Sequence, residues 1–251
     1  MQKSILSSIL LLGAVCAQAN NYTVTSPNGK LVMNVKCEGG KASYTVDLNG
    51  KQMLAASALG LVANYGDFSQ GLTMGALKGA PKHLTYVMDH TKKSHVEKDV
   101  YEATIGFLNA KKDSMTLHLH VSDNDVAYKY EMSRPKKDNP KSVIIYKEVS
   151  GFNFPEKTTT FLCPQITPMT GWERTKPSYE EEYTPNAQMN VKSQFGVGYT
   201  FPCLFKVGED GWVLVSETGV SSAYPGSRLS DYEPGKGYTV AFPQKGENNG
   251  V

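Results

Sequence analysis

Short stretches in which apolar and polar residues alternate recur along this chain, and they constrain its fold more than any other feature. Residues 101–107 place Tyr, Ala, Ile and Phe at every second position, and residues 117–121 do the same with Leu, Leu and Val. A period of two is typical of a strand with one buried face. No window of about 11 residues or more combines a 3.6-residue period with helix caps. The pattern predicts an all-β, antiparallel sandwich.

Turn residues separate these stretches. Strands are predicted over 31–37 and 42–48, and Asn49-Gly50 after the second predicts a type I′ turn, which needs positive φ at both central positions. Ser26-Pro27-Asn28-Gly29 predicts another turn. Further strands are predicted over 101–107, 117–121, 127–132, 141–149, 212–216 and 237–242. Residues 163–190 differ from the rest and predict a long irregular loop, which is usually functional in a compact domain.

The composition excludes two broad classes of protein. Of the 251 residues, 40% are hydrophobic, and 26 Lys+Arg against 24 Asp+Glu leave a net charge of +2. A disordered chain would combine low hydrophobicity with high net charge. A nucleic-acid binder would carry a strong basic excess. The chain is therefore expected to be a folded globular protein that does not bind nucleic acid.

The N-terminus predicts a signal peptide over residues 1–19. Lys3 supplies the positive start, Ile5–Val15 the apolar stretch, and Ala17-Gln18-Ala19 a small-x-small cleavage site. The apolar stretch is about 11 residues long, whereas a membrane-spanning helix needs roughly 20. We expect residues 20–251 to form one domain of a secreted or periplasmic protein without a transmembrane segment. Lipidation at Cys16 is the less favoured alternative, because Val15 stands where a lipobox usually has Gly or Ala.

Three cysteines remain after the signal peptide: Cys37, Cys163 and Cys203. The number is odd and no spacing is C-x-x-C, so a disulfide framework is not indicated. Three buried free thiols are favoured over one disulfide with one thiol.

No common catalytic motif is present, including the nucleophile elbow, the P-loop and H-E-x-x-H. His118 and His120 lie two apart on one predicted strand face, a spacing that suits a metal but is more often an exposed polar face. An epimerase-like site pairing one of them with Glu217 as base is a distant alternative. His83, His90 and His95 are interpreted as part of a solvated loop.

Residues 172–183 hold the remaining candidates. A run of three glutamates, Glu180-Glu181-Glu182, is either a solvated face or a source of oxygen ligands for a hard cation such as calcium. One segment supplies too few ligands for a full shell of calcium, so other carboxylates would be needed. Trp172, Tyr179 and Tyr183 form either a wall on which a sugar stacks or part of an aromatic core.

Several short segments, taken in order, resemble the N-terminal domain of glycoside hydrolase family 97. They run from about residue 22 to the end, and their order is more specific than any one of them. They are Ser26-Pro27-Asn28-Gly29-Lys30-Leu31, the hairpin with Tyr44, Val46 and Asn49-Gly50-Lys51, Ser57-Ala58-Leu59-Gly60-Leu61, residues 125–130 (DVAYKY) and residues 172–183 (WERTKPSYEEEY).

The resemblance implies a β-super-sandwich of the galactose mutarotase-like kind in a secreted, calcium-dependent α-glucosidase or α-galactosidase of polysaccharide utilisation. The catalytic carboxylates of such enzymes lie in a following (β/α)₈ barrel, which needs about 250 residues more. This chain ends at Val251, so we expect it to be truncated before the barrel and to carry no catalytic residues.

The family's N-terminal domain lends one glutamate, from a motif that resembles Tyr-Glu-x-x-Tyr, to a calcium ion held with the barrel. Here the motif falls on Tyr179, Glu180 and Tyr183, so Glu180 takes the ligand role, with Glu181 and Glu182 as alternative registers. Trp172, Tyr179 and Tyr183 are the expected contacts to an oligosaccharide or α-glycoside. A free-standing carbohydrate-binding module is the alternative function.

Overall fold

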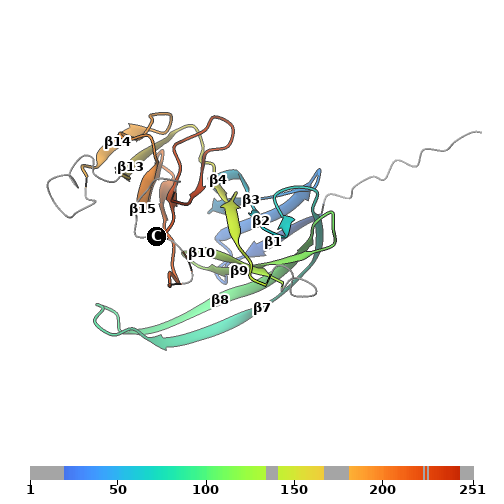
Figure 1. Ribbon diagram of the computed structural model, residues 1–251. Helices are drawn as coiled ribbons and strands as arrows, with labels where there is room; N and C mark the ends of the chain where they lie inside the picture. Colours follow the sequence, from blue (N-terminus) through green and yellow to red (C-terminus); the bar gives the residue numbers. More distant parts are fainter. Residues whose placement is uncertain (1–19, 134–140, 167–180, 223, 225, 244–251) are drawn as a thin grey trace, which may run out of the picture.

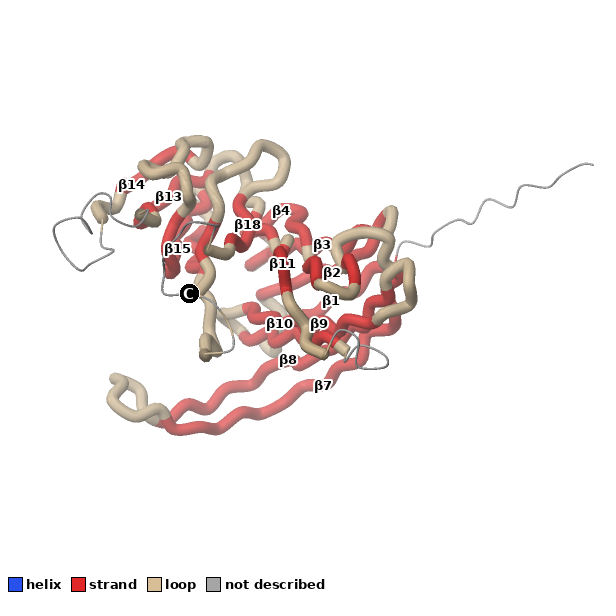
Figure 2. Tube along the Cα trace, viewed as in Figure 1, coloured by secondary structure: helices blue, strands red, loops and turns tan. Residues whose placement is uncertain are grey.

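The computed structural model describes residues 20–133, 141–166, 181–222, 224 and 226–243. In this part of the chain there are eighteen β-strands and no helix. Figure 2 shows the strands in red and the loops in tan, with no segment in the helix colour. Every strand pairing is antiparallel. The expected all-β antiparallel sandwich is confirmed. The described residues contain no helix of the length and apolarity that a membrane span requires.

Two four-stranded sheets form the N-terminal half of the molecule. The first has the order β1-β2-β3-β4, and its strands are β1 (Asn20–Thr25), β2 (Leu31–Glu38), β3 (Lys41–Leu48) and β4 (Lys51–Ala58). The second has the order β10-β9-β8-β7, and its strands are β7 (Thr73–Val87), β8 (His95–Leu108), β9 (Ser114–Ser122) and β10 (Val126–Met132). Asn49 and Gly50 have φ values of 52° and 73°, so the predicted turn between β3 and β4 has the positive φ that type I′ demands.

The C-terminal half is a seven-stranded sheet with the order β12-β18-β17-β15-β13-β14, in which β16 also pairs with β15. Its strands are β12 (Gly151–Phe152), β13 (Thr158–Pro164), β14 (Thr184–Gln188), β15 (Tyr199–Val207), β16 (Gly211–Val215), β17 (Arg228–Leu229) and β18 (Tyr238–Ala241). A small sheet has the order β11-β5-β6, and its strands are β5 (Leu61–Ala63), β6 (Gly66–Asp67) and β11 (Ile145–Glu148). Its strand β11 contacts β18 of the C-terminal sheet.

The two halves share one core. The Ala55 amide of β4 donates to the carbonyl of Asn153, next to β12, at 2.7 Å, so the first sheet and the seven-stranded sheet are linked by the backbone. One apolar cluster contains both Met33 and Leu117 from the N-terminal half and Phe205 from the C-terminal half. Burial of this continuous apolar face is the main force that holds the sandwich together.

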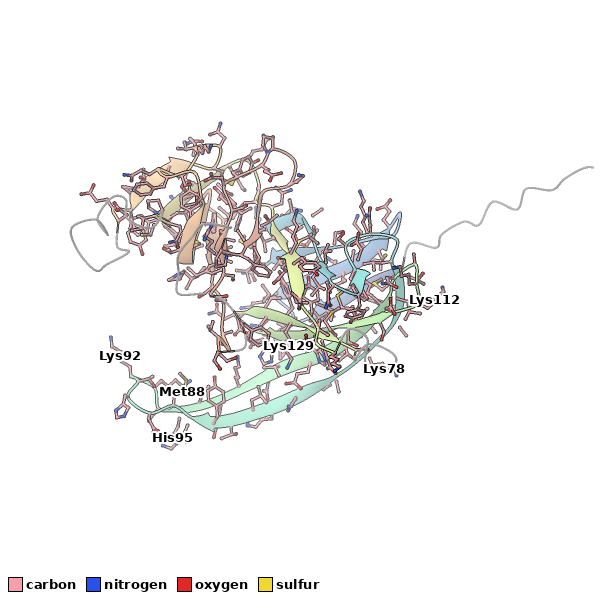
Figure 3. All side chains as sticks on the ribbon, in the orientation of Figure 1. Lys78, Met88, Lys92, His95, Lys112 and Lys129 are labelled. Atoms are coloured by element: carbon pink, nitrogen blue, oxygen red, sulfur yellow. The ribbon has the colours of Figure 1, made fainter. Side chains whose placement is uncertain are left out.

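A long hairpin projects from the second sheet. Strands β7 and β8 pair from Thr73↔Leu108 to Val87↔His95, whereas β9 covers β8 only from Val100 onward. Figure 1 shows the far end of this hairpin running clear of the body, and Figure 3 places Met88, Lys92 and His95 at its tip. We call residues 80–99 the arm.

The arm shows that the interpretation of His83, His90 and His95 as one solvated loop was wrong. His83 lies in β7 and His95 in β8, so only His90 of the three histidines belongs to a turn. The arm contains Pro81 and several Lys and His residues, so its sequence lacks the apolar alternation that predicts a strand. Such residues are common at exposed edges, where they discourage further pairing.

Two other predictions need correction. Of the stretch 141–149, only Ile145–Glu148 forms a strand, β11. The predicted irregular loop at 163–190 begins with the end of β13 and includes β14, whose residues are nearly all exposed and lack an apolar alternation.

Candidate functional site

The segment Glu181–Tyr183 runs beside strand β13 and leads into β14. The Cys163 thiol lies 3.6 Å from the carbonyl oxygen of Glu181, and Leu162 pairs with Thr184. The Tyr183 ring stacks on Phe161 with centroids 4.7 Å apart and an interplanar angle of 20°. These contacts hold the segment against the sheet edge and set the positions of its carboxylates.

The two described glutamates lie at the molecular surface. Glu181 is half-buried and Glu182 is exposed. Carboxylate oxygens are the donors that calcium prefers, so the chemistry of this segment fits a calcium ligand. Among the described residues no group of three or more His, Cys, Asp or Glu side chains is arranged to hold a metal ion. Glu180 itself lies outside the described residues.

Of the three aromatic residues predicted to contact a sugar, only Tyr183 is described by the structure. Tyr183 is 44% exposed and its stacking partner Phe161 is 39% exposed, so both rings present surface to solvent. Trp172 and Tyr179 lie outside the described residues. An exposed, stacked pair of rings suits a contact surface better than a filled core.

The predicted histidine pair is engaged by carboxylates. His118 Nε2 lies 2.7 Å from Glu131, and the His120 nitrogens lie 3.9 Å from Glu102 and from Asp125. These contacts stand on a partly exposed strand face. They favour the interpretation of a polar face, which the sequence already preferred, over a metal site.

Glu217 has a structural contact. Its carboxylate accepts hydrogen bonds from the Ser227 backbone N–H at 3.1 Å and from the Ser227 hydroxyl at 2.5 Å. These bonds join the start and the end of the connection between β16 and β17, residues 216–227. Each residue of the distant epimerase alternative thus has a partner of its own.

A partly buried polar cluster, which the sequence did not predict, links the sheets. The Tyr130 hydroxyl accepts from the Gly60 N–H at 2.9 Å and contacts the Ser150 hydroxyl at 2.8 Å. Burial raises the pKa of Glu148, and the charge of Glu217 adds to the rise while a hydrogen bond from Ser150 opposes it. Strand alternation places Tyr130 on the half-buried face of β10, but only the fold brings Gly60 and Ser150 to it.

The cysteines behave as predicted. Cys37, Cys163 and Cys203 are all free and buried. Burial raises the pKa of the Cys203 thiol to about 12, so it is protonated and unreactive at neutral pH.

Comparison with known proteins gives the chain its context. Residues 24–244 match the family described as Glycosyl-hydrolase 97 N-terminal. The solved structure of a β-arabinopyranosidase matches with 48% identity and a TM-score of 0.85, covering 91% of this chain and 36% of that one. A family 97 enzyme from Pseudoalteromonas sp. strain K8, solved with panose, matches at 17% identity and a TM-score of 0.71. The same enzyme solved with acarbose gives 19% and 0.72, and each of these two matches covers 88% of this chain and 32% of that one. No curated protein sequence matches the chain.

An antiparallel sandwich, without helices in the part of the chain that the structure describes, together with this family match defines a glycoside hydrolase N-terminal domain. The chain belongs to glycoside hydrolase family 97 and corresponds to the N-terminal domain of that family. It spans about a third of the length of the solved structures that it matches.

Proposed function

We propose that this domain works with a (β/α)₈ catalytic barrel in an exported, calcium-dependent glycoside hydrolase. It shapes one side of the substrate pocket and lends a glutamate to a calcium ion that the barrel also holds. Residues 1–19 direct export to the periplasm or the exterior, where such an enzyme degrades polysaccharides. The observation that supports the proposal most is the surface position of Glu181–Tyr183, at the same sequence motif that carries the family resemblance.

Glu180 is the proposed ligand, and Glu181 and Glu182 are its alternative registers. When bound, the calcium ion supplies positive charge that polarises oxygen atoms of the substrate or of water. Contacts of the described residues that follow Glu180 support this role: the Tyr183–Phe161 stack and the Cys163–Glu181 contact hold residues 181–183 against the sheet. A segment that is already ordered loses less conformational entropy when it binds a metal ion shared with another domain.

The sugar is proposed from the relatives. The relative with 48% identity is a β-arabinopyranosidase, so arabinopyranosides are the first substrates to test, beside α-glucosides and α-galactosides. Trp172, Tyr179 and Tyr183 are the proposed sugar contacts from this domain.

The test is a chimera in which residues 20–251 replace the matching region of the β-arabinopyranosidase. Glu180→Gln is expected to weaken calcium affinity at least tenfold and to lower activity at limiting calcium, with activity restored by excess calcium. Glu181→Gln and Glu182→Gln remove the same charge at the alternative registers, so the variant that weakens calcium affinity identifies the ligand. Unchanged calcium dependence in all three variants refutes the ligand role.

The alternative function is a free-standing carbohydrate-binding module, and the exposed Tyr183–Phe161 pair is the observation that favours it. It predicts measurable heat when residues 20–251 alone are titrated with starch, galactoside or arabinoside oligomers, and loss of that heat in Trp172→Ala. Calorimetry without heat for any of these ligands excludes the module.

A further inference from the structure

Large apolar side chains form a row on the outer face of the seven-stranded sheet. Phe161 of β13 pairs with Leu204 of β15, and Leu204 pairs with Leu214 of β16. Paired residues of antiparallel strands point to the same side, so these three side chains lie next to one another across three strands. Tyr183 extends the row beyond Phe161, and Trp212 stands two residues from Leu214 on the same face. We call these five residues the outer stripe.

The outer stripe is exposed to an unusual degree. Besides Phe161 and Tyr183, Trp212 is 58% and Leu214 is 63% exposed, while Leu204 is half-buried. The opposite face of the same strands carries fully buried residues such as Cys203 and Phe205. Scattered apolar residues are normal on a surface, but a contiguous patch of this kind marks a place of contact.

The strand at one end of the stripe has an unprotected edge. Within the described residues β16 pairs only with β15. Its sequence, Gly-Trp-Val-Leu-Val, contains no charged residue and no proline. The other long edge strand, β7, carries Lys78, Pro81 and Lys82, which are common protections against unwanted pairing. The contrast indicates that β16 is covered when the protein is assembled.

The chemistry of the stripe favours a protein as its partner. Leucine side chains offer no hydrogen bonds to sugar hydroxyls, and two of the five residues are leucines. Aromatic residues, here Trp212, Phe161 and Tyr183, within a polar and charged rim are typical of a protein interface. Such charge stands beside the stripe in the exposed ion pair of Lys206 and Glu209, whose atoms lie 3.0 Å apart.

Position identifies the partner. Tyr183 belongs to the stripe and directly follows Glu181 and Glu182 in the sequence. A domain that shares a metal ion with this segment therefore meets the stripe next to it. The solved relatives are about three times as long as the region that this chain matches. Their remaining two thirds are large enough to form a domain that covers the outer stripe.

We propose that the outer stripe, centred on Leu214 and Trp212, is the surface on which the catalytic domain of the enzyme docks. The inference rests on the proposed function, because it names the partner surface of the same site. The stripe excludes water from the contact and orients the glutamate segment toward the shared metal ion.

The test compares labelling of an introduced cysteine in residues 20–251 alone and in the active chimera described above. Leu214→Cys and the control Val87→Cys replace side chains of similar exposure, 63% and 60%, and the native thiols are buried. In the isolated domain both variants are expected to react with a maleimide at similar rates. In the chimera Leu214→Cys is expected to react at least tenfold more slowly, while the rate of Val87→Cys stays within twofold.

Equal labelling of Leu214→Cys in both proteins overturns the proposal. Protection in the isolated domain that grows with its concentration assigns the stripe to a second copy, and protection by oligosaccharide assigns it to a sugar; either result also overturns it. Calcium affinity of Glu180→Gln is read separately, so a failed ligand role leaves the labelling result valid. If the chimera does not fold, the same pair of substitutions is placed at the aligned positions of the β-arabinopyranosidase, and amide hydrogen exchange of the residue aligned with Trp212 provides the second measurement.

Discussion

Replacing Tyr130 with phenylalanine removes one oxygen atom from the cluster that links the two halves of the sandwich. The Tyr130 hydroxyl accepts the Gly60 N–H at 2.9 Å and contacts the Ser150 hydroxyl at 2.8 Å. Gly60 is buried and Ser150 is fully buried. A lost hydrogen bond costs about 1 kcal/mol, and a buried N–H left without a partner costs about 1–3 kcal/mol. The free energy of unfolding is expected to fall by about 2–3 kcal/mol.

Urea unfolding followed by circular dichroism measures this change in residues 20–251. For a domain of this size a loss of about 2–3 kcal/mol lowers the urea midpoint by roughly 1 M at an unchanged slope. Tyr146→Phe is the matched control, because Tyr146 is 63% exposed and its hydroxyl is expected to matter little. A double-mutant cycle with Ser150→Ala should give a coupling energy of about 1 kcal/mol. If Tyr130→Phe is no less stable than the control, the cluster does not stabilise the junction of the sheets.

Three further outcomes are expected. Gly198→Ala should cost about 3 kcal/mol or more in thermal or urea unfolding, because its φ is +94° and an added Cβ would stand 1.9 Å from the Leu229 carbonyl oxygen; Gly29→Ala, with φ +75° and open space, should cost about 1 kcal/mol. Burial raises the pKa of Glu148, so its contribution favours the fold below the pKa of the unfolded chain and is lost as the pH rises through the raised value. Urea unfolding at pH values from about 4 to 7 should therefore show wild type losing stability relative to Glu148→Gln, and parallel curves would contradict this. The native thiols are free and buried, so Ellman's reagent should find no fast-reacting thiol in residues 20–251 until denaturant is added.

The local structure of this chain could be predicted for part of the strands that bury one face against the core; β13 and β15 also bury one face and were not predicted. Strands β2 and β3 alternate buried and half-exposed residues, and the Asn49-Gly50 turn has the φ values that its sequence demands. Strand β7 was missed because both faces of its distal half meet solvent, so no apolar alternation is selected there. Strand β14 was missed for the same reason.

The candidate site could be predicted only as a segment. The tyrosine and glutamate residues of 179–183 point to a surface contact, and the described part of that segment lies at the surface. The stacking of Tyr183 on Phe161 joins residues 22 positions apart, and the row from Phe161 to Leu214 depends on the register of three strands. Register across a sheet follows from the whole set of pairings, so no local pattern contains it.

The open edge at β16 arises because two short strands, β16 and β17, share the place beside β15. Both β16 and β17 pair with β15, at Cys203–Val207 and at Tyr199–Thr200, so together they fill the place of a single long strand. The excursion between them is linked by the Glu217–Ser227 bonds. Beyond β17 the sheet continues through β18, whereas β16 has no further partner strand among the described residues. The sheet thus ends at the strand that carries Trp212 and Leu214. Apolar side chains on an edge strand are removed from water only when another structure packs against them. The division of this strand therefore places an open edge next to the outer stripe, since β16 carries Trp212 and Leu214, and a docked domain would cover both.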